Sequence, residues 1–410
     1  MKTLQQYINE NFDNYLKLSN EDKNRLLELD LKFHVLLNEF KHEHVHYMNV
    51  VNSKEKIDYI LDQVKKGEDF NLKIEYENSK FQDAKWCDEM IKKLSDLINE
   101  FLSIKNCYIS KFYSYRLNKT ISSILFLKQY CIDNNTFPKN ISKPAKYLYD
   151  NAIKELKKTK FIDIYKLNDD IYKRTFSPEE SQKRLQNVMD KLGYGWNVVI
   201  DDNMIPRMSV RPYKELRISS KNKFSEVDLQ SLEVHEIGVH TARKYYALQT
   251  GLYLFLYGLK GSNKYDEGLA IFNSLNKVKN PKPNILFYIC IKIIILYHLY
   301  TMSNIELFNF VKALTDAPDK VIALSIIRAS RNFAFTLEST GSADVDYFDG
   351  YTRIKDMSNQ EKERLLKFNI GPDQLYELDT IEKFFKVNKF KPLEYCEPGH
   401  DEHESQDIDY

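Results

Sequence analysis

This chain has few cysteines and almost no net charge. Among its 410 residues are five scattered cysteines, and no two of them form a Cys-x-x-Cys pair. This usage indicates neither a disulfide framework nor a cysteine-ligated metal site, and it fits a reducing, cytoplasmic compartment best. The 60 basic and 59 acidic residues nearly cancel, to +1. Because nucleic-acid binders usually carry a basic excess on one face, this balance argues against a nucleic-acid partner.

A long uninterrupted apolar run is also missing. The most hydrophobic stretch, residues 285–300, contains 16 residues and is interrupted by Lys292 and His298. A membrane-spanning helix needs about 20 predominantly apolar residues. We therefore expect a buried core helix here and no membrane partner. The first residues of the chain, Met1 to Tyr7, do not carry the apolar core of a signal peptide.

Helical patterns dominate what the chain does contain, with one short extended region in the middle. Apolar residues recur at helical spacing in residues 1–40, 53–66, 84–104, 119–131, 144–158 and 347–368. The pair Ser177-Pro178 predicts the start of a further helix that ends near Gly193 or Gly195. Three short strands are predicted at residues 196–201, 208–210 and 216–219. The expected fold class is α+β and predominantly helical, with a small mixed sheet.

The most informative pattern is His235-Glu236-Ile237-Gly238-Val239-His240, which is followed by Glu267 in a Glu-Gly-Leu-Ala string. Two imidazoles and a carboxylate are ligands of catalytic zinc, which takes three protein ligands and keeps a fourth position for water. We predict that His235, His240 and Glu267 bind Zn2+, a metal inferred from ligand types that other divalent ions share. Glu236 would then act as the general base and acid.

The spacing of the two histidines makes a specific structural prediction. In a regular α-helix residues at i and i+4 share a face, whereas His235 and His240 stand at i and i+5, about 140° apart. A π-bulge inserts one residue and restores the shared face, and Gly238 lacks the Cβ that would crowd it. We therefore predict a widened turn near residues 237–240. A buried helix with two hydrogen-bonded histidines is the alternative, which the string alone does not exclude.

Two other histidine groups carry weaker signals. The run His42-Glu43-His44-Val45-His46 would place three histidines on one face of a strand, but no carboxylate or cysteine partner is identifiable for it. Cys396, His400 and His403 stand in residues 394–410, which hold seven acidic residues and no Lys or Arg. This composition predicts a disordered tail. We interpret both groups as solvated or structural.

The central motifs resemble those of a known family. His235-Glu236-x-Gly238-x-His240-x-x-Arg243, followed by Glu267-Gly268-Leu269-Ala270, is similar to the microtubule-associated tyrosine carboxypeptidases and their bacterial relatives with a Gln-Glu-Gly-Leu-Ala motif. Weaker similarity extends to residues 49–76 and to Asp344-x-x-Tyr347-x-x-Gly350, so the resemblance covers roughly residues 40–370. Asp266 stands where the family has Gln or Glu, and Ala343 stands where it has Lys.

The resemblance implies a zinc carboxypeptidase that removes a C-terminal residue, which is tyrosine on tubulin in the characterised members. It implies the same ligands, His235, His240 and Glu267, and the same catalytic residue, Glu236. It also implies a zincin-like metallopeptidase fold, with the small sheet over the helix that carries the two histidines. The expected partner is the C-terminus of a peptide or protein.

A carboxypeptidase must also bind the free carboxylate of its substrate, and arginine pairs with carboxylates in a bidentate manner. Arg328 and Arg331, three residues apart on one helix face, are the candidates. An ordinary salt-bridged helix face is the alternative for this pair. Tyr347 is a candidate hydrogen-bond donor to the tetrahedral intermediate. Residues 216–219 are expected to offer backbone hydrogen bonds to the substrate.

The expected organisation of the chain has three parts. Residues 1–39 are expected to be a helical N-terminal extension, residues 40–375 the catalytic domain, and residues 376–410 an acidic, disordered tail. The tail ends in Asp409-Tyr410, which raises the hypothesis that it is a self-substrate. Two alternatives to a zinc carboxypeptidase stay open: an endopeptidase or aminopeptidase with the same site, and a metal-binding pseudoenzyme that acts as an interaction protein.

Overall fold

The structure is a computed structural model, and it describes residues 18–44, 53–72, 84–104, 107, 109–132, 143–162, 170–202, 207–211, 214–278, 281, 284–299, 301–331, 343–377, 379 and 382. Several predictions lie outside these residues. They concern the apolar stripe at residues 4–16, the side chains of His42 and His44, and the tail from residue 383 onward, which includes Cys396, His400 and His403.

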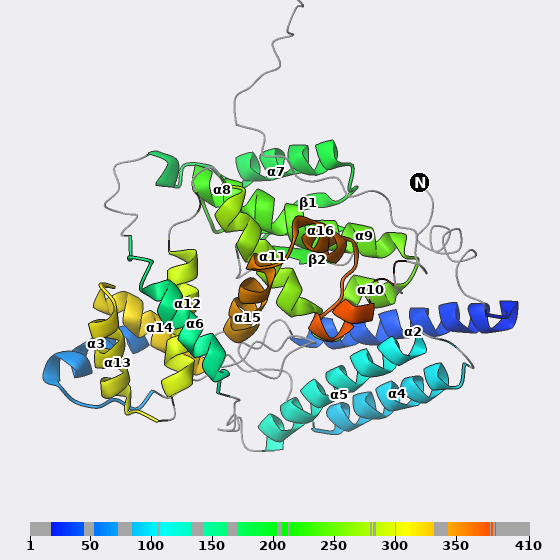
Figure 1. The fold of residues 1–410 in the computed structure, drawn as a ribbon, viewed down its shortest axis with the longest axis horizontal. Coiled ribbons are helices and arrows are strands. Elements are labelled where there is room, and N and C mark those ends of the chain that lie inside the picture. The colour runs from blue at the N-terminus through cyan, green and yellow to red at the C-terminus, as the bar shows by residue number, and fades with distance from the viewer. Residues whose placement is uncertain are drawn as a thin grey trace, which may run out of the picture.

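Three long helices lie side by side at the N-terminal end of the described chain: α2 (Asn20–His44), α4 (Ala84–Leu102) and α5 (Ser110–Ile132) (Figure 1). Helix α2 buries a stripe at helical spacing, which comprises Leu26, Leu29, Phe33 and Leu37. These side chains belong to the same apolar core as residues of the later helices. The boundary predicted between residues 39 and 40 therefore falls inside a helix.

The predicted strands form one small mixed sheet. Strands β1 (Asn197–Asp201), β2 (Met208–Arg211) and β3 (Glu215–Ser219) are ordered β1-β3-β2. β1 runs parallel to β3, and β2 runs antiparallel to it. Helix α7 (Pro178–Leu192) packs beside β1; it begins with the expected Ser177 cap and ends at Gly193 in a left-handed conformation.

The centre of the molecule is a continuous helical run with a change of pitch. It comprises α8 (Glu226–Leu232), the π-helix η2 (Glu233–Thr241) and α9 (Ala242–Gln249). Ser225 begins the run with a reciprocal capping box to Asp228. The short α10 (Tyr253–Tyr257) and then α11 (Ser262–Asn276) follow, and α11 packs against both η2 and α15 (Ala343–Lys355).

A second apolar core lies among α3 (Ser53–Lys66), α6 (Lys146–Leu156), α12 (Ile285–His298), α13 (Asn304–Leu314) and α14 (Asp319–Arg331) (Figure 1). Helix α12 is the apolar run of the sequence, and it is buried within this core. Among the described residues, none of the helices is both long and apolar enough to span a bilayer.

The C-terminal part differs from the sequence prediction. Residues 347–368 are not one helix: α15 begins earlier, at Ala343, and α16 (Asn359–Lys367) follows after a break. Ser358 explains the break, because its hydroxyl and Glu361 form a capping box that starts a new helix. The 3-10 turns η1 (Asp170–Tyr172) and η3 (Pro372–Glu377) complete the described elements.

Two glycines allow α11 and α15 to approach closely. A Cβ on Gly268 would lie 2.4 Å from the carbonyl carbon of Gly350, and one on Gly350 would lie 1.8 Å from the carbonyl oxygen of Lys264. No side chain fits in either place. The crossing carries Glu267 on one helix and Tyr347 on the other, so the glycines set the distance between these two side chains.

Candidate metal centre and active-site pocket

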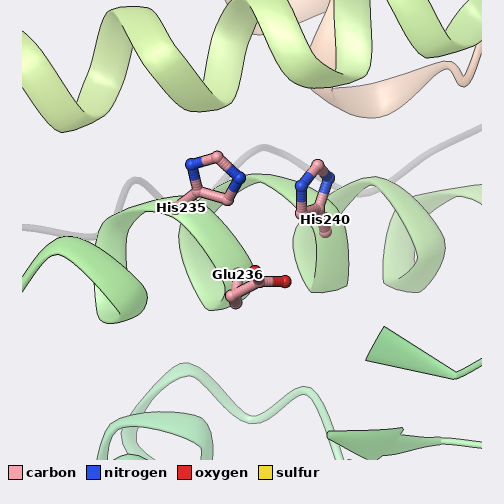
Figure 2. Close-up of side chains that lie close together, drawn as sticks. All are labelled: His235, Glu236 and His240. Carbon is pink, nitrogen blue, oxygen red and sulfur yellow. The ribbon is translucent and has the colours of Figure 1, made fainter. Parts of the chain in front are cut away.

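The π-helix puts both histidines of the motif on one face. The Ala242 N–H donates to the carbonyl of Ile237, five residues earlier, which is the hydrogen bond of a π-turn. The ring centroids of His235 and His240 are 4.9 Å apart, and Figure 2 shows both rings rising from the same side of the helix. The predicted widened turn is confirmed, and it extends over nine residues rather than one bulge.

Glu267 from α11 faces this pair. Its Oε2 atom lies 3.6 Å from His235 Nε2 and 3.8 Å from His240 Nε2. Zinc–ligand bonds of about 2.0–2.1 Å in a tetrahedron separate neighbouring ligand atoms by about 3.4 Å. Both Glu267 contacts are close to this separation, so Glu267 lies where it could share a metal ion with the two histidines.

Helix α11 also supplies a partner to the other nitrogen of each ring. Asp266 Oδ2 lies 3.0 Å from His240 Nδ1, and Ser274 Oγ lies 3.4 Å from His235 Nδ1. Such partners fix the orientation of the ring and the identity of the nitrogen that faces the metal. The motif did not predict these roles. Asp266 stood out only as a difference from the family's Gln or Glu, and Ser274 lies outside the motif.

Arg243 anchors Asp266 from behind. Its Nη1 atom lies 3.1 Å from Asp266 Oδ1, and its guanidinium is fully buried. It also donates to the backbone carbonyls of Ser262, Leu365 and Ile370. Arg243 thus joins the start of α11 and the segment after α16 to the metal centre, which explains the arginine in the motif.

Neighbouring charges outweigh burial in setting the pKa values of Asp266 and His240. Burial alone raises the pKa of Asp266, but the charges of His240 and Arg243 hold it well below its ordinary range. Burial alone lowers the pKa of His240, but the carboxylates of Asp266 and Glu267 raise it above its ordinary value. Asp266 is consequently a carboxylate at neutral pH, and its negative charge lies 3.0 Å from Nδ1 of the His240 ring.

The centre opens into a pocket of about 560 Å³. Its walls come from β2, the α8–η2–α9 run, α11, α12 and α15. Glu236 lines it, and donor atoms of His235, Glu236 and His240 lie within 4.8 Å of one another. In Figure 2 the Glu236 carboxylate leaves the helix on a different side from the rings. Glu236 is thus a second carboxylate beside the histidines, but it does not make the contacts with the ring nitrogens that Glu267 makes.

Tyr347 also lines the pocket, as the sequence predicts for a site residue. It lies near the Glu267 carboxylate. The charge of Glu267 and burial raise the pKa of Tyr347 well above its ordinary value, so the phenol keeps its proton and remains a donor.

Neither of the arginines predicted to bind the substrate carboxylate is found in the described pocket wall. Arg328 is exposed on α14 and is not among the residues that line the pocket, while the side chain of Arg331 lies outside the described residues. The cations in the described pocket wall are Lys244 and Lys292 instead. In the sequence, Lys292 was recognised only as a charge that interrupts an apolar run. Lys244 was not predicted as a site residue, although it follows His240 by one helical turn.

The expected substrate strand also changes. Residues 216–219 belong to β3, whose backbone pairs with β1 on one side and β2 on the other. Strands β1 and β2 are the two edges of the described sheet, and Met208, Ser209 and Val210 of β2 line the pocket.

Fold and site together define an α+β protein with a histidine–carboxylate group that could hold a metal ion, set in a pocket beside a sheet edge. A family model described as microtubule-associated tyrosine carboxypeptidase matches residues 73–277. The chain belongs to this family. It is therefore a peptidase of the carboxypeptidase kind, whose substrate is a peptide or protein. None of the curated proteins matches the chain.

Proposed function

We propose that the protein is a zinc-dependent carboxypeptidase of zincin type that hydrolyses the C-terminal peptide bond of a peptide or protein. The observation that carries this proposal is the convergence of one Glu267 oxygen on the Nε2 atoms of His235 and His240, at 3.6 and 3.8 Å. These three residues would hold the ion. Zinc bound there supplies polarisation of the scissile carbonyl and lowers the pKa of the attacking water.

Glu236 is the proposed general base and acid. It takes a proton from the attacking water and delivers it to the nitrogen of the leaving residue. Its position in the pocket beside both histidines supports this role. Glu267 is preferred as the ligand because one of its oxygens lies close to the Nε2 atoms of both histidines.

Tyr347 is proposed to stabilise the oxyanion that forms on the scissile carbonyl. The support is its place in the pocket wall and its protonated state, because an oxyanion needs a donor that is already oriented.

The edge strand β2 is proposed to bind the substrate main chain. An edge strand presents unpaired N–H and C=O groups, and an extended peptide can add to it as a further strand. The sheet order and the three β2 residues in the pocket wall support this assignment in place of β3.

A preference for C-terminal tyrosine is the finest part of the proposal. The pocket lining includes the apolar side chains of Ile271, Ile285 and Ile289. A bulky ring buried against such side chains gains hydrophobic free energy that a small or charged side chain does not.

The first test is mass spectrometry of a mixed peptide library after incubation with the zinc-loaded protein, beside Glu236→Gln. We expect loss of one C-terminal residue, tyrosine most often, and loss of at least about a hundredfold of the rate in the variant. Internal or N-terminal cuts that depend on Glu236 would favour the endopeptidase or aminopeptidase alternative. No cleavage by either protein would favour the metal-binding pseudoenzyme.

A further inference from the structure

We propose that Lys244 binds the terminal carboxylate of the substrate and so makes the pocket specific for free C-termini. The inference rests on the proposed carboxypeptidase function and assigns the anchor for the carboxylate, which that function leaves open. Lys244 is half-buried on α9 and lines the pocket.

The charge of Lys244 is not neutralised by the carboxylate next to it. Its ammonium lies close enough to Asp266 to help lower the pKa of that carboxyl. Both Asp266 oxygens already have partners, since Oδ2 faces His240 and Oδ1 faces Arg243. Within the described part of the chain, Lys244 has neither an ion pair nor a hydrogen bond.

The other pocket cation is committed elsewhere. Lys292 forms a largely buried ion pair with Asp344 of α15, and both side chains are less than a fifth exposed. A substrate carboxylate would have to displace Asp344 to use it, and breaking a buried pair is costly. Lys244 requires no such exchange, so it is the better anchor.

Lys244 also borders the part of the pocket where a terminal carboxylate would lie. That carboxylate is one residue beyond the scissile carbonyl, which is about 3.3–3.6 Å of extended chain. Lys244 follows His240 by four residues in the same helical run, and its flexible side chain lines the same pocket as the two histidines. An endopeptidase substrate would place an uncharged peptide group there.

The test measures binding without cleavage. A fluorescein-labelled peptide that ends in tyrosine is made as the free acid and as the amide, and its Kd is measured by anisotropy with zinc-loaded Glu236→Gln protein. We expect the free acid to bind about tenfold to a hundredfold more tightly than the amide, the range for a hydrogen bond to a charged group. Adding Lys244→Ala should remove this preference, and Lys244→Arg should restore most of it.

Lys320→Ala is the matched control, because Lys320 is exposed on α14 and lies away from the pocket. In the active protein, Lys244→Ala should raise KM for the free peptide with little change in kcat. An equal loss of affinity for both peptides, or no loss, would overturn the proposal. If the wild type cleaves no peptide, the proposed hydrolysis fails, and the anisotropy comparison still decides whether Lys244 recognises the carboxylate.

Discussion

At the scale of single residues, Asp266 links the ligand set to the rest of the molecule. One carboxylate oxygen faces His240 and the other faces the buried Arg243. A Gln at this position would offer one carbonyl oxygen and no charge. The carboxylate therefore strengthens the hold on His240, and Arg243 offsets the cost of burying that charge.

Replacing Asp266 by Asn should weaken the metal centre while leaving its ligands in place. We expect zinc affinity to fall about tenfold to a hundredfold, as for other partners that orient metal-binding histidines. Competition with a chromophoric chelator measures this directly. Ser274→Ala is the matched control for the other ring and should cost less, because a neutral hydroxyl at 3.4 Å is the weaker partner. Equal zinc affinity in Asp266→Asn and wild type would refute the role.

At the scale of elements, the crossing of α11 and α15 decides whether Glu267 and Tyr347 meet. Gly350→Ala would drive a Cβ into the backbone of Lys264, 1.8 Å from its carbonyl oxygen, so the helices must separate. We expect a loss of about 1–3 kcal/mol in the free energy of unfolding, the usual cost of overpacking, measured by urea denaturation. Gly268→Ala should act similarly from the other helix.

The two glycine substitutions should not be additive, because one separation of the helices relieves both clashes. The double variant should therefore cost less than the sum of the single ones. An unchanged urea midpoint in Gly350→Ala would mean that the helices do not need this close contact.

At the scale of the whole molecule, Asp30 joins the N-terminal helices to the central ones. This carboxyl on α2 accepts hydrogen bonds from the Tyr113 hydroxyl of α5 and from the N–H groups of Tyr253 and Leu254 at the start of α10. It is 1% exposed. Burial raises its pKa from 3.8 to about 7, against the lowering effect of these three donors.

The raised pKa of Asp30 predicts a pH dependence of stability. Between about pH 4 and pH 7 the unfolded chain releases this proton while the folded protein keeps it. The contribution is therefore fully present below pH 4 and is lost as the pH rises through about 7. Urea unfolding of Asp30→Asn should lack this part of the pH slope. Parallel pH profiles for variant and wild type would contradict the assignment.

The sequence by itself determined much of the local structure and the shared face of the two histidines. The spacing of His235 and His240 required a widened helix, and the π-helix meets that requirement within a single element. The caps at Ser177 and Ser225 and the three strands are also local, because turn chemistry and side-chain alternation decide them. The break at Ser358 was readable in the same way but was missed.

Only the tertiary structure decided which distant groups reach that helix. The partners Asp266 and Ser274, the edge position of β2, and the absence of Arg328 from the described pocket wall all depend on how separate elements pack. Sequence patterns fix which side of a helix is apolar, but they do not fix the neighbour that covers it or the depth of approach. Here that approach is set by the contact between Gly268 and Gly350, far apart in the chain, where the missing Cβ atoms let two backbones touch.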